Sequence, residues 1–149
     1  MTSRFTVAIH ILSLLDLNQG ESITSEDLAV SVNTNPVVIR KILGILKKAG
    51  LIQIQMGQGG GASLAVESEK ITLKDVYTVF DERLFVLHPS KPNAKCICGR
   101  NIQSILTEVF SDTERVLVAE LSHSCLLYTS EMQKTITPKF YTIQSITRL

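Results

Sequence analysis

The chain has 149 residues, a formal net charge of +1 and 44% hydrophobic residues, a length that suits one compact domain and an appendage. The near-neutral charge excludes a uniformly basic nucleic-acid binder, so any DNA-binding surface must come from local segregation of charge. The low aromatic content (5%) and the absence of Trp argue against a platform that stacks single-stranded bases.

The first predicted element is a helix that opens near Ser3 and contains the apolar run from Phe5 to Leu17. Polar residues interrupt this run, it is too short to span a bilayer, and no small-residue cleavage site follows it. We therefore expect a buried helix and no membrane contact. The three unevenly spaced cysteines do not form a secreted disulfide framework, so the cytoplasm is the expected compartment.

Two short helices separated by a tight turn are predicted next. Thr24 and Asp27 have the spacing of a capping box, which opens the first of these helices. Asn33 fits the turn, because a short polar side chain tolerates left-handed backbone. The pair Asn35-Pro36 is typical of the N-cap and first residue of a helix, which opens the second one.

The second helix, predicted over Pro36 to Ala49, has two different sides. Its apolar side is expected in the core and comprises Ile39, Ile42, Leu43, Ile45 and Leu46. The same helix carries four cations, Arg40, Lys41, Lys47 and Lys48. A solvated basic face is the alternative interpretation. However, no Asp or Glu occurs from Leu28 to Val66, and this acid-free run with the two-helix spacing favours a helix-turn-helix that contacts DNA.

A glycine-rich hairpin follows the second helix. Gly50 is expected to end that helix, and residues 51–55 alternate apolar and polar as a half-buried strand does. Glycines at four positions between 57 and 61 form the bend, and residues 62–66 return as the partner strand. A phosphate-binding loop is the alternative, but its terminal lysine with serine or threonine is missing. The pattern therefore indicates a wing.

A second capping-box spacing, Thr72 to Asp75, predicts a helix through Phe80. After an irregular segment, Asn101 is expected to cap a long helix that runs to about Leu121. A wide apolar stripe on a helix has to be buried against another surface. The simplest such surface is the same helix of a second subunit. Folding back onto its own domain is the alternative.

These elements predict a mostly α-helical fold. A winged helix-turn-helix domain with a two-stranded wing is expected over residues 1–82, and a cysteine-containing loop over 83–100. A long dimerisation helix is expected over residues 101–122. Residues 123–149 show no steady period, and the pattern does not place them.

Three motifs together resemble the Rrf-type family of bacterial winged-helix transcription regulators, which includes IscR, NsrR and CymR. They are AIHILSLL in the first helix, NPVVIRKILGILKKAGLI, and GQGGGASL in the wing. The resemblance covers about residues 1–121. VNTNPVVIRK and the shortened cysteine segment are most similar to the YwnA-like branch.

The resemblance implies a homodimer joined by the long helix, with two winged domains on a palindromic operator in double-stranded DNA. In this family repression by steric occlusion is the more common mode of action. Matched by position, the DNA-contacting residues would be Ser25, Thr34, Asn35, Val37, Val38, Arg40, Lys41, Lys48, Met56 and Gln58. Family members often have arginine where this chain has Met56, so the wing is expected to contribute less in an A·T-rich minor groove.

Several family members hold an iron–sulfur cluster through three cysteines before the long helix. Here only Cys96 and Cys98 lie there, and adding His88 leaves the set one ligand short. A zinc site would lack the usual C-x-x-C spacing. We therefore expect no metal or cofactor. The hypothesis for Cys96 and Cys98 is a thiol switch, and two ordinary loop thiols are the alternative. The flanking cations that would favour thiolate are Lys91, Lys95 and Arg100.

The leading functional interpretation is a dimeric, sequence-specific DNA-binding transcription regulator. A winged-helix module that docks proteins is the second interpretation, and a steep salt dependence of binding would separate the two. A small thiol enzyme is the third. It lacks a Cys-x-x-Cys motif and a converging His and Asp set, so no catalytic residue is assigned.

Overall fold

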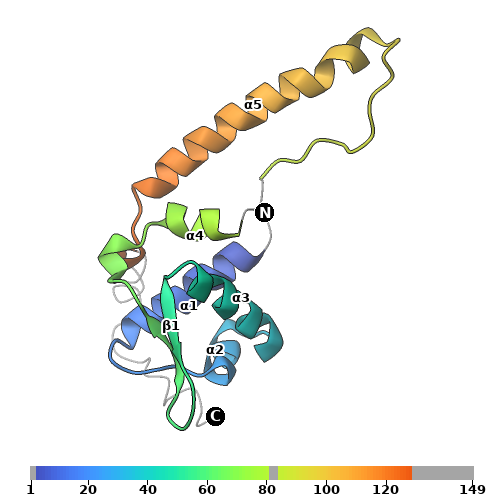
Figure 1. Cartoon of the computed structure of the whole chain (residues 1–149). Helices are drawn as coiled ribbons and strands as arrows, with labels where there is room; N and C mark the ends of the chain where they lie inside the picture. Colours follow the sequence, from blue (N-terminus) through green and yellow to red (C-terminus); the bar gives the residue numbers. More distant parts are fainter. Residues whose placement is uncertain (1–2, 81–83, 129–149) are drawn as a thin grey trace.

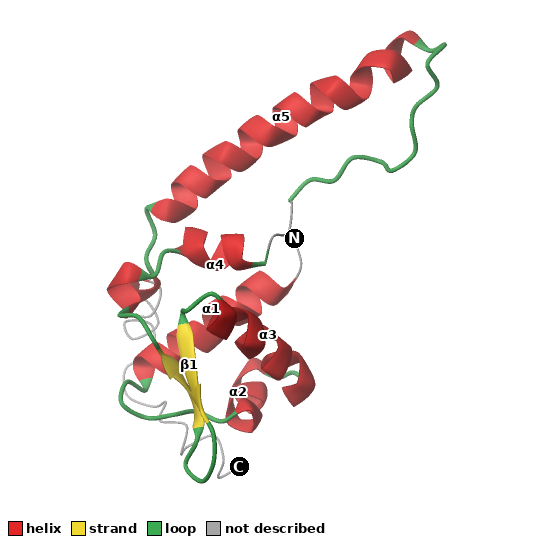
Figure 2. Ribbon diagram, viewed as in Figure 1, coloured by secondary structure: helices red, strands yellow, loops and turns green. Residues whose placement is uncertain are grey.

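The computed structural model of the chain describes residues 3–80 and 84–128. In order, the elements are α1 (Ser3–Leu17), α2 (Ser25–Val32), α3 (Pro36–Lys48), β1 (Ile52–Gln55), β2 (Gly61–Leu64), the 3-10 helix η1 (Ser68–Lys70), α4 (Leu73–Val79) and α5 (Ile97–Ser122). Figure 2 shows a mainly helical fold with one antiparallel hairpin, which confirms the predicted fold class.

One apolar core joins the N-terminal helices, the hairpin and the residues that follow α5. Its fully buried members include Ile11, Leu12, Leu15, Leu28, Ile39, Ile42, Leu46, Ile71, Val76 and Leu126. Each such side chain contributes about 1.5–3 kcal/mol on burial, so α1 is held firmly inside as predicted. Ile45 corrects the predicted core side of α3, because it is only half-buried. It lies about 100° round the helix from Leu46, at the edge of the buried stripe.

The helix ends follow the predicted local signals. Asn33 has left-handed backbone (φ 55°) and Asn35 Oδ1 accepts a hydrogen bond from the Val37 N–H at 2.8 Å. At α4 the capping box is complete: Thr72 N–H donates to Asp75 Oδ2 at 2.8 Å, and Asp75 N–H donates to Thr72 Oγ1 at 3.1 Å. These caps fix where α3 and α4 begin.

At α2 the predicted capping box is only half formed. The Asp27 N–H donates to Thr24 Oγ1 at 3.2 Å, as an N-cap requires. The Asp27 carboxylate accepts from the Thr24 hydroxyl at 2.7 Å instead of from its backbone N–H. That backbone group is therefore left to other partners, while the helix still begins after Thr24.

The wing has a third backbone partner that the sequence pattern did not indicate. Strands β1 and β2 pair antiparallel, with Ile52 opposite Leu64 and Gln55 opposite Gly61. Ile23 also pairs with Ala62, through backbone hydrogen bonds of 2.9 and 2.8 Å. Because Ile23 immediately precedes the N-cap of α2, this bridge ties the wing to the helix-turn-helix.

Helix α5 begins at Ile97 with Cys96 at its N-cap, so the predicted start at Asn101 is wrong. Asn93 makes the difference, since its side chain accepts from Lys95 N–H at 2.9 Å and its carbonyl accepts from Cys96 N–H at 3.1 Å. The resulting turn opens the helix one turn early. The side-chain amide of Asn101 instead donates back to the Ile97 carbonyl at 3.3 Å, inside the helix.

Helix α5 extends away from the winged domain, and none of its residues is buried (Figure 1). The segment before it lies along one side. The ring of Phe85 stacks on Phe110 with 4.8 Å between centroids, and Gln103 Nε2 donates to the carbonyls of His88 and Ser90. A second contact comes from α4, where the Tyr77 hydroxyl donates to Glu114 Oε1 at 3.1 Å, and the side of α5 that carries Ile102, Ile105, Val109 and Val116 stays exposed.

The residues after α5 return to the winged domain, which the sequence pattern left unplaced. Cys125 pairs with Thr72, the Leu73 N–H donates to the Ser124 carbonyl at 2.8 Å, and Leu126 is fully buried. The C-terminal end of α5 is therefore anchored beside α4. Residues 129–149 of the unplaced tail lie outside the described residues.

Candidate nucleic-acid interface

Helix α3 presents a continuous outward face. Ile39, Ile42, Leu43 and Leu46 are buried, and on the opposite side Val37, Lys41, Gly44 and Lys48 recur at helical spacing. Val37 is 51% exposed and the neighbouring Val38 is 41% exposed. This face carries two lysines and two exposed methyl-bearing side chains. Such groups suit phosphates and thymine methyls respectively.

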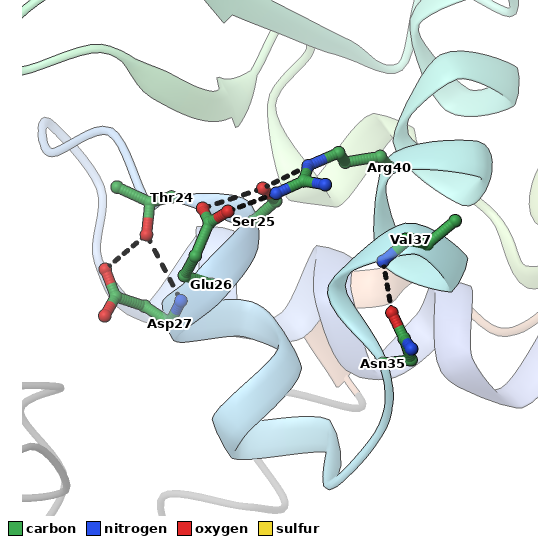
Figure 3. Close-up of polar contacts among 7 residues, drawn as sticks. All are labelled: Thr24, Ser25, Glu26, Asp27, Asn35, Val37 and Arg40. Carbon is green, nitrogen blue, oxygen red and sulfur yellow. Dashed lines mark hydrogen bonds and ion pairs between the residues drawn. The ribbon is translucent and has the colours of Figure 1, made fainter.

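Arg40 is held by the preceding helix (Figure 3). Its Nε–H donates to Ser25 Oγ at 3.2 Å, and its Nη2 forms an ion pair with Glu26. Ser25 Oγ in turn donates to Glu26 Oε2 at 2.8 Å. These contacts occupy one edge of the guanidinium and leave the Nη1 hydrogens pointing elsewhere, because the group has five N–H donors in a planar fork.

Glu26 was not singled out from the sequence, although it changes the electrostatics of this surface. Hydrogen bonds from Ser25 and then from Arg40 hold the pKa of the Glu26 carboxyl below its ordinary value, so it stays ionised at neutral pH. The carboxylate precedes the acid-free run by two residues and reaches it across the α2–α3 contact. Both Arg40 and Glu26 are more than half exposed, at 57% and 60% of the side chain.

The remaining predicted contact residues lie around this face. Thr34 is half-buried in the turn, where its N–H donates to the Ala29 carbonyl at 3.0 Å, and Asn35 is exposed. Met56 and Gln58 lie at the tip of the wing, where Met56 is 88% exposed. The structure thus brings Ser25 and Arg40 together, and it places Met56 and Gln58 on a separate projection.

None of the three cysteines lies on α3 or in the wing. Cys96 and Cys98 are exposed at the beginning of α5, and Cys125 follows its end. The 26-residue helix between them is about 39 Å long. Backbone N–H groups of Gly99 and Cys98 lower the pKa of the Cys96 thiol. The helix start is therefore the cause of the lowered pKa, in place of the flanking cations invoked from the sequence.

Residues 1–127 match the family model described as Rrf2, iron-dependent transcriptional regulator. The chain belongs to the Rrf2 family of transcriptional regulators. A relative in Bacillus subtilis strain 168, the candidate HTH-type transcriptional regulator YwnA, is 42% identical over 128 residues, which cover 85% of this chain and 93% of YwnA. The expected membership and the expected likeness to the YwnA-like branch are both confirmed.

Solved structures support the same fold. A candidate DNA-binding protein is similar at 38% identity and a TM-score of 0.66, covering 83% of this chain and 96% of that one. A candidate transcriptional regulator from Lactobacillus plantarum is 27% identical with a TM-score of 0.68, covering 85% and 87%. CymR of B. subtilis, at 16% identity and a TM-score of 0.63, covers 89% and 96% and shares the fold.

The Rrf2 family and its members are transcriptional regulators, so this protein is a regulator and not an enzyme. No helix among the described residues is both long and apolar enough to cross a membrane.

The iron in the family's description does not fit the donors of this chain. Cys96 and Cys98 lie at the beginning of α5 and Cys125 follows its end, so most of the helix separates the pair from Cys125. Within residues 3–80 and 84–128, no three His, Cys, Asp or Glu side chains come together as a metal site.

Proposed function

We propose that this Rrf2-family regulator binds double-stranded operator DNA as a homodimer, with α3 in the major groove, and represses by occluding the promoter. The observation that carries the proposal is the outward face of α3. Lys41, Lys47 and Lys48 are exposed on a helix that contains no acidic residue, and no described carboxylate forms an ion pair with them. Unneutralised cations on a recognition helix favour binding to phosphates.

A homodimer would double this surface. The exposed apolar side of α5 offers the contact, and a two-fold axis would place two copies of α3 on successive major-groove faces. A palindromic operator follows from that symmetry. The relatives described as transcriptional or DNA-binding proteins support the choice of DNA as the partner.

Selection of bound fragments from sheared genomic DNA, followed by gel-shift titration, tests the proposal. If about six to ten phosphates are contacted, affinity should fall by about 10³–10⁵-fold between about 50 and 200 mM salt. Recovery of one recurrent palindrome is the expected result. Failure to enrich any sequence, with binding to other proteins that salt does not weaken, would favour the docking module instead.

The wing is proposed to reach the minor groove with Met56 and Gln58. Since Met56 is 88% exposed and uncharged, Met56→Arg is expected to tighten binding to operators with A·T-rich flanks, where a narrow minor groove attracts arginine. Met56→Gln is the uncharged control, and G·C-rich flanks are the control DNA. Gel shifts that give Met56→Arg and wild type equal affinity on every flank would show that the wing does not reach this groove.

A thiol switch is proposed at the beginning of α5. The Cys96 thiol is exposed and its pKa is lowered, so a larger fraction is thiolate at neutral pH than for an ordinary cysteine. Peroxide treatment is expected to change operator affinity in wild type but not in Cys96→Ser, with Cys125→Ser as the matched control. Equal affinities before and after oxidation of wild type, with modification of Cys96 verified by mass spectrometry, would leave the thiols without a regulatory role.

A further inference from the structure

Gly44 lies in the interior of α3 although the fold does not need a glycine there. All eight glycines of the chain lie within the described residues. Four have φ between 74° and 98°, a range that favours glycine, and in three others a Cβ would collide with backbone atoms. For Gly44 neither condition applies. A Cβ built at Gly44 meets no heavy atom within 4 Å beyond its own helix and chain neighbours.

The glycine is also unfavourable for the helix itself. Apart from proline, glycine is the poorest helix former, because it loses the most backbone entropy on folding. Alanine at this position would keep the same backbone and fill open space. Folding therefore gives no reason for Gly44, and the reason must be sought on the outer side of the helix.

Gly44 occupies the middle of the outward face. Val37, Lys41, Gly44 and Lys48 follow one another at spacings of four, three and four residues, opposite the buried stripe. A helix with its side chains is about 10–12 Å across, and the major groove of B-DNA is about 12 Å wide. A side chain at the centre of the inserted face would therefore hold the helix axis away from the base edges.

We propose that Gly44 is a close-approach position of the DNA-binding surface. It lets the backbone of α3 approach the DNA so that Val37 and Arg40 reach base edges while Lys41 and Lys48 reach phosphates on either side. The inference rests on the proposed function. It adds Gly44 to the DNA-binding surface, where the lack of a side chain is what allows close contact.

The test is a size series, Gly44→Ala, Gly44→Ser and Gly44→Leu, because stability and DNA affinity should rank differently. In thermal unfolding followed by circular dichroism, Gly44→Ala should have the highest Tm, about 2–4 °C above wild type. The Tm of Gly44→Leu and Gly44→Ser should also exceed that of wild type. Affinity should fall with side-chain volume instead. Gly44→Leu is expected to weaken binding about 5–150-fold, the range for forcing methylene groups into a close-packed contact.

The DNA probe is the shortest duplex that wild-type protein retains from sheared genomic DNA, with a random-sequence duplex of equal length beside it. Gly44→Ala decides the matter, since it is the most stable variant and its weaker binding cannot come from unfolding. If Ala and Leu variants bind the selected duplex as tightly as wild type, the role of Gly44 is overturned and the proposed function stands. If wild type retains no duplex, the proposed function itself fails.

Discussion

Negative charges on the exposed stripe of α5 are expected to produce a monomer that has lost operator binding. The stripe comprises Ile102, Ile105, Val109 and Val116, which are 40%, 53%, 51% and 66% exposed. They recur at spacings of three, four and seven residues and so share one face of the helix. Phe110 and Gln103 contact the preceding loop from another side, which leaves the stripe open for a second subunit.

The test variant is Val109→Glu with Val116→Glu. Two carboxylates facing their symmetry copies would be desolvated and would repel each other, so association should fail. A monomer engages only one half-site, and operator affinity should fall by about 10²–10⁴-fold through loss of avidity. Light scattering gives the mass, and gel shifts on the full operator give the affinity.

Ser104→Glu is the matched control, because Ser104 is exposed on the same helix away from the stripe. It adds one carboxylate to α5, against two in the test variant, and should leave both mass and affinity unchanged. Wild-type protein that scatters as a monomer at micromolar concentration would remove the dimer from the proposal, whatever the variants do.

The elements that the sequence predicted well depend on short-range chemistry. Asn33 in left-handed backbone, Asn35 as the N-cap of α3 and Thr72 with Asp75 at α4 each involve residues within a few positions of one another. Their residue types carry the backbone preference directly, so a local pattern suffices. The outward and inward faces of α3 follow from helical period for the same reason.

The contacts that sequence reasoning missed join residues far apart in the chain. The Ile23–Ala62 bridge crosses 39 positions, and Leu126 enters a core built from α1 to α4, which begin between 53 and 123 residues earlier. No local pattern encodes such pairings, because they depend on how the elements pack. Helix α5 starts earlier than predicted because Asn93, eight residues before the expected cap at Asn101, forms the turn in which the helix begins.

The same limit affected the candidate site. Arg40 was expected from its place on the helix, but its ion pair with Glu26 spans 14 residues and was not indicated. An acidic residue beside a basic face could have been noted as a potential partner. Only the packing of α2 against α3 determines that the carboxylate reaches Arg40 and none of the lysines.

Arg40→Ala is expected to weaken binding to the selected operator by about 1–3 kcal/mol, the value for losing one bidentate contact to a guanine. The geometry supports a reading role. Ser25 and Glu26 hold one edge of the Arg40 guanidinium. The other edge keeps its Nη1–H and Nη2–H groups in a fixed orientation, and these can donate to O6 and N7 of a guanine. Binding to random-sequence DNA should change much less.

Two further variants separate reading from general attraction. Lys48→Ala removes an exposed cation and should weaken specific and random DNA evenly, with a shallower salt dependence. Glu26→Gln removes a negative charge from the surface, which favours binding to any DNA. It also replaces the ion pair with a weaker neutral hydrogen bond, so the guanidinium is held less firmly. The ratio of its affinity for the selected operator to its affinity for random-sequence DNA should therefore fall, even if its affinity for random-sequence DNA rises.

Operators altered at single base pairs complete the assignment. If Arg40 reads a guanine, replacing that guanine should weaken wild-type protein but leave Arg40→Ala unaffected, because the contact is already absent. Arg40→Ala that binds the selected operator as tightly as wild type would take Arg40 out of the reading role. Its pairing with Glu26 would then serve only to fasten α3 to α2, and base recognition would be left to Val37 and Val38 on the same helix.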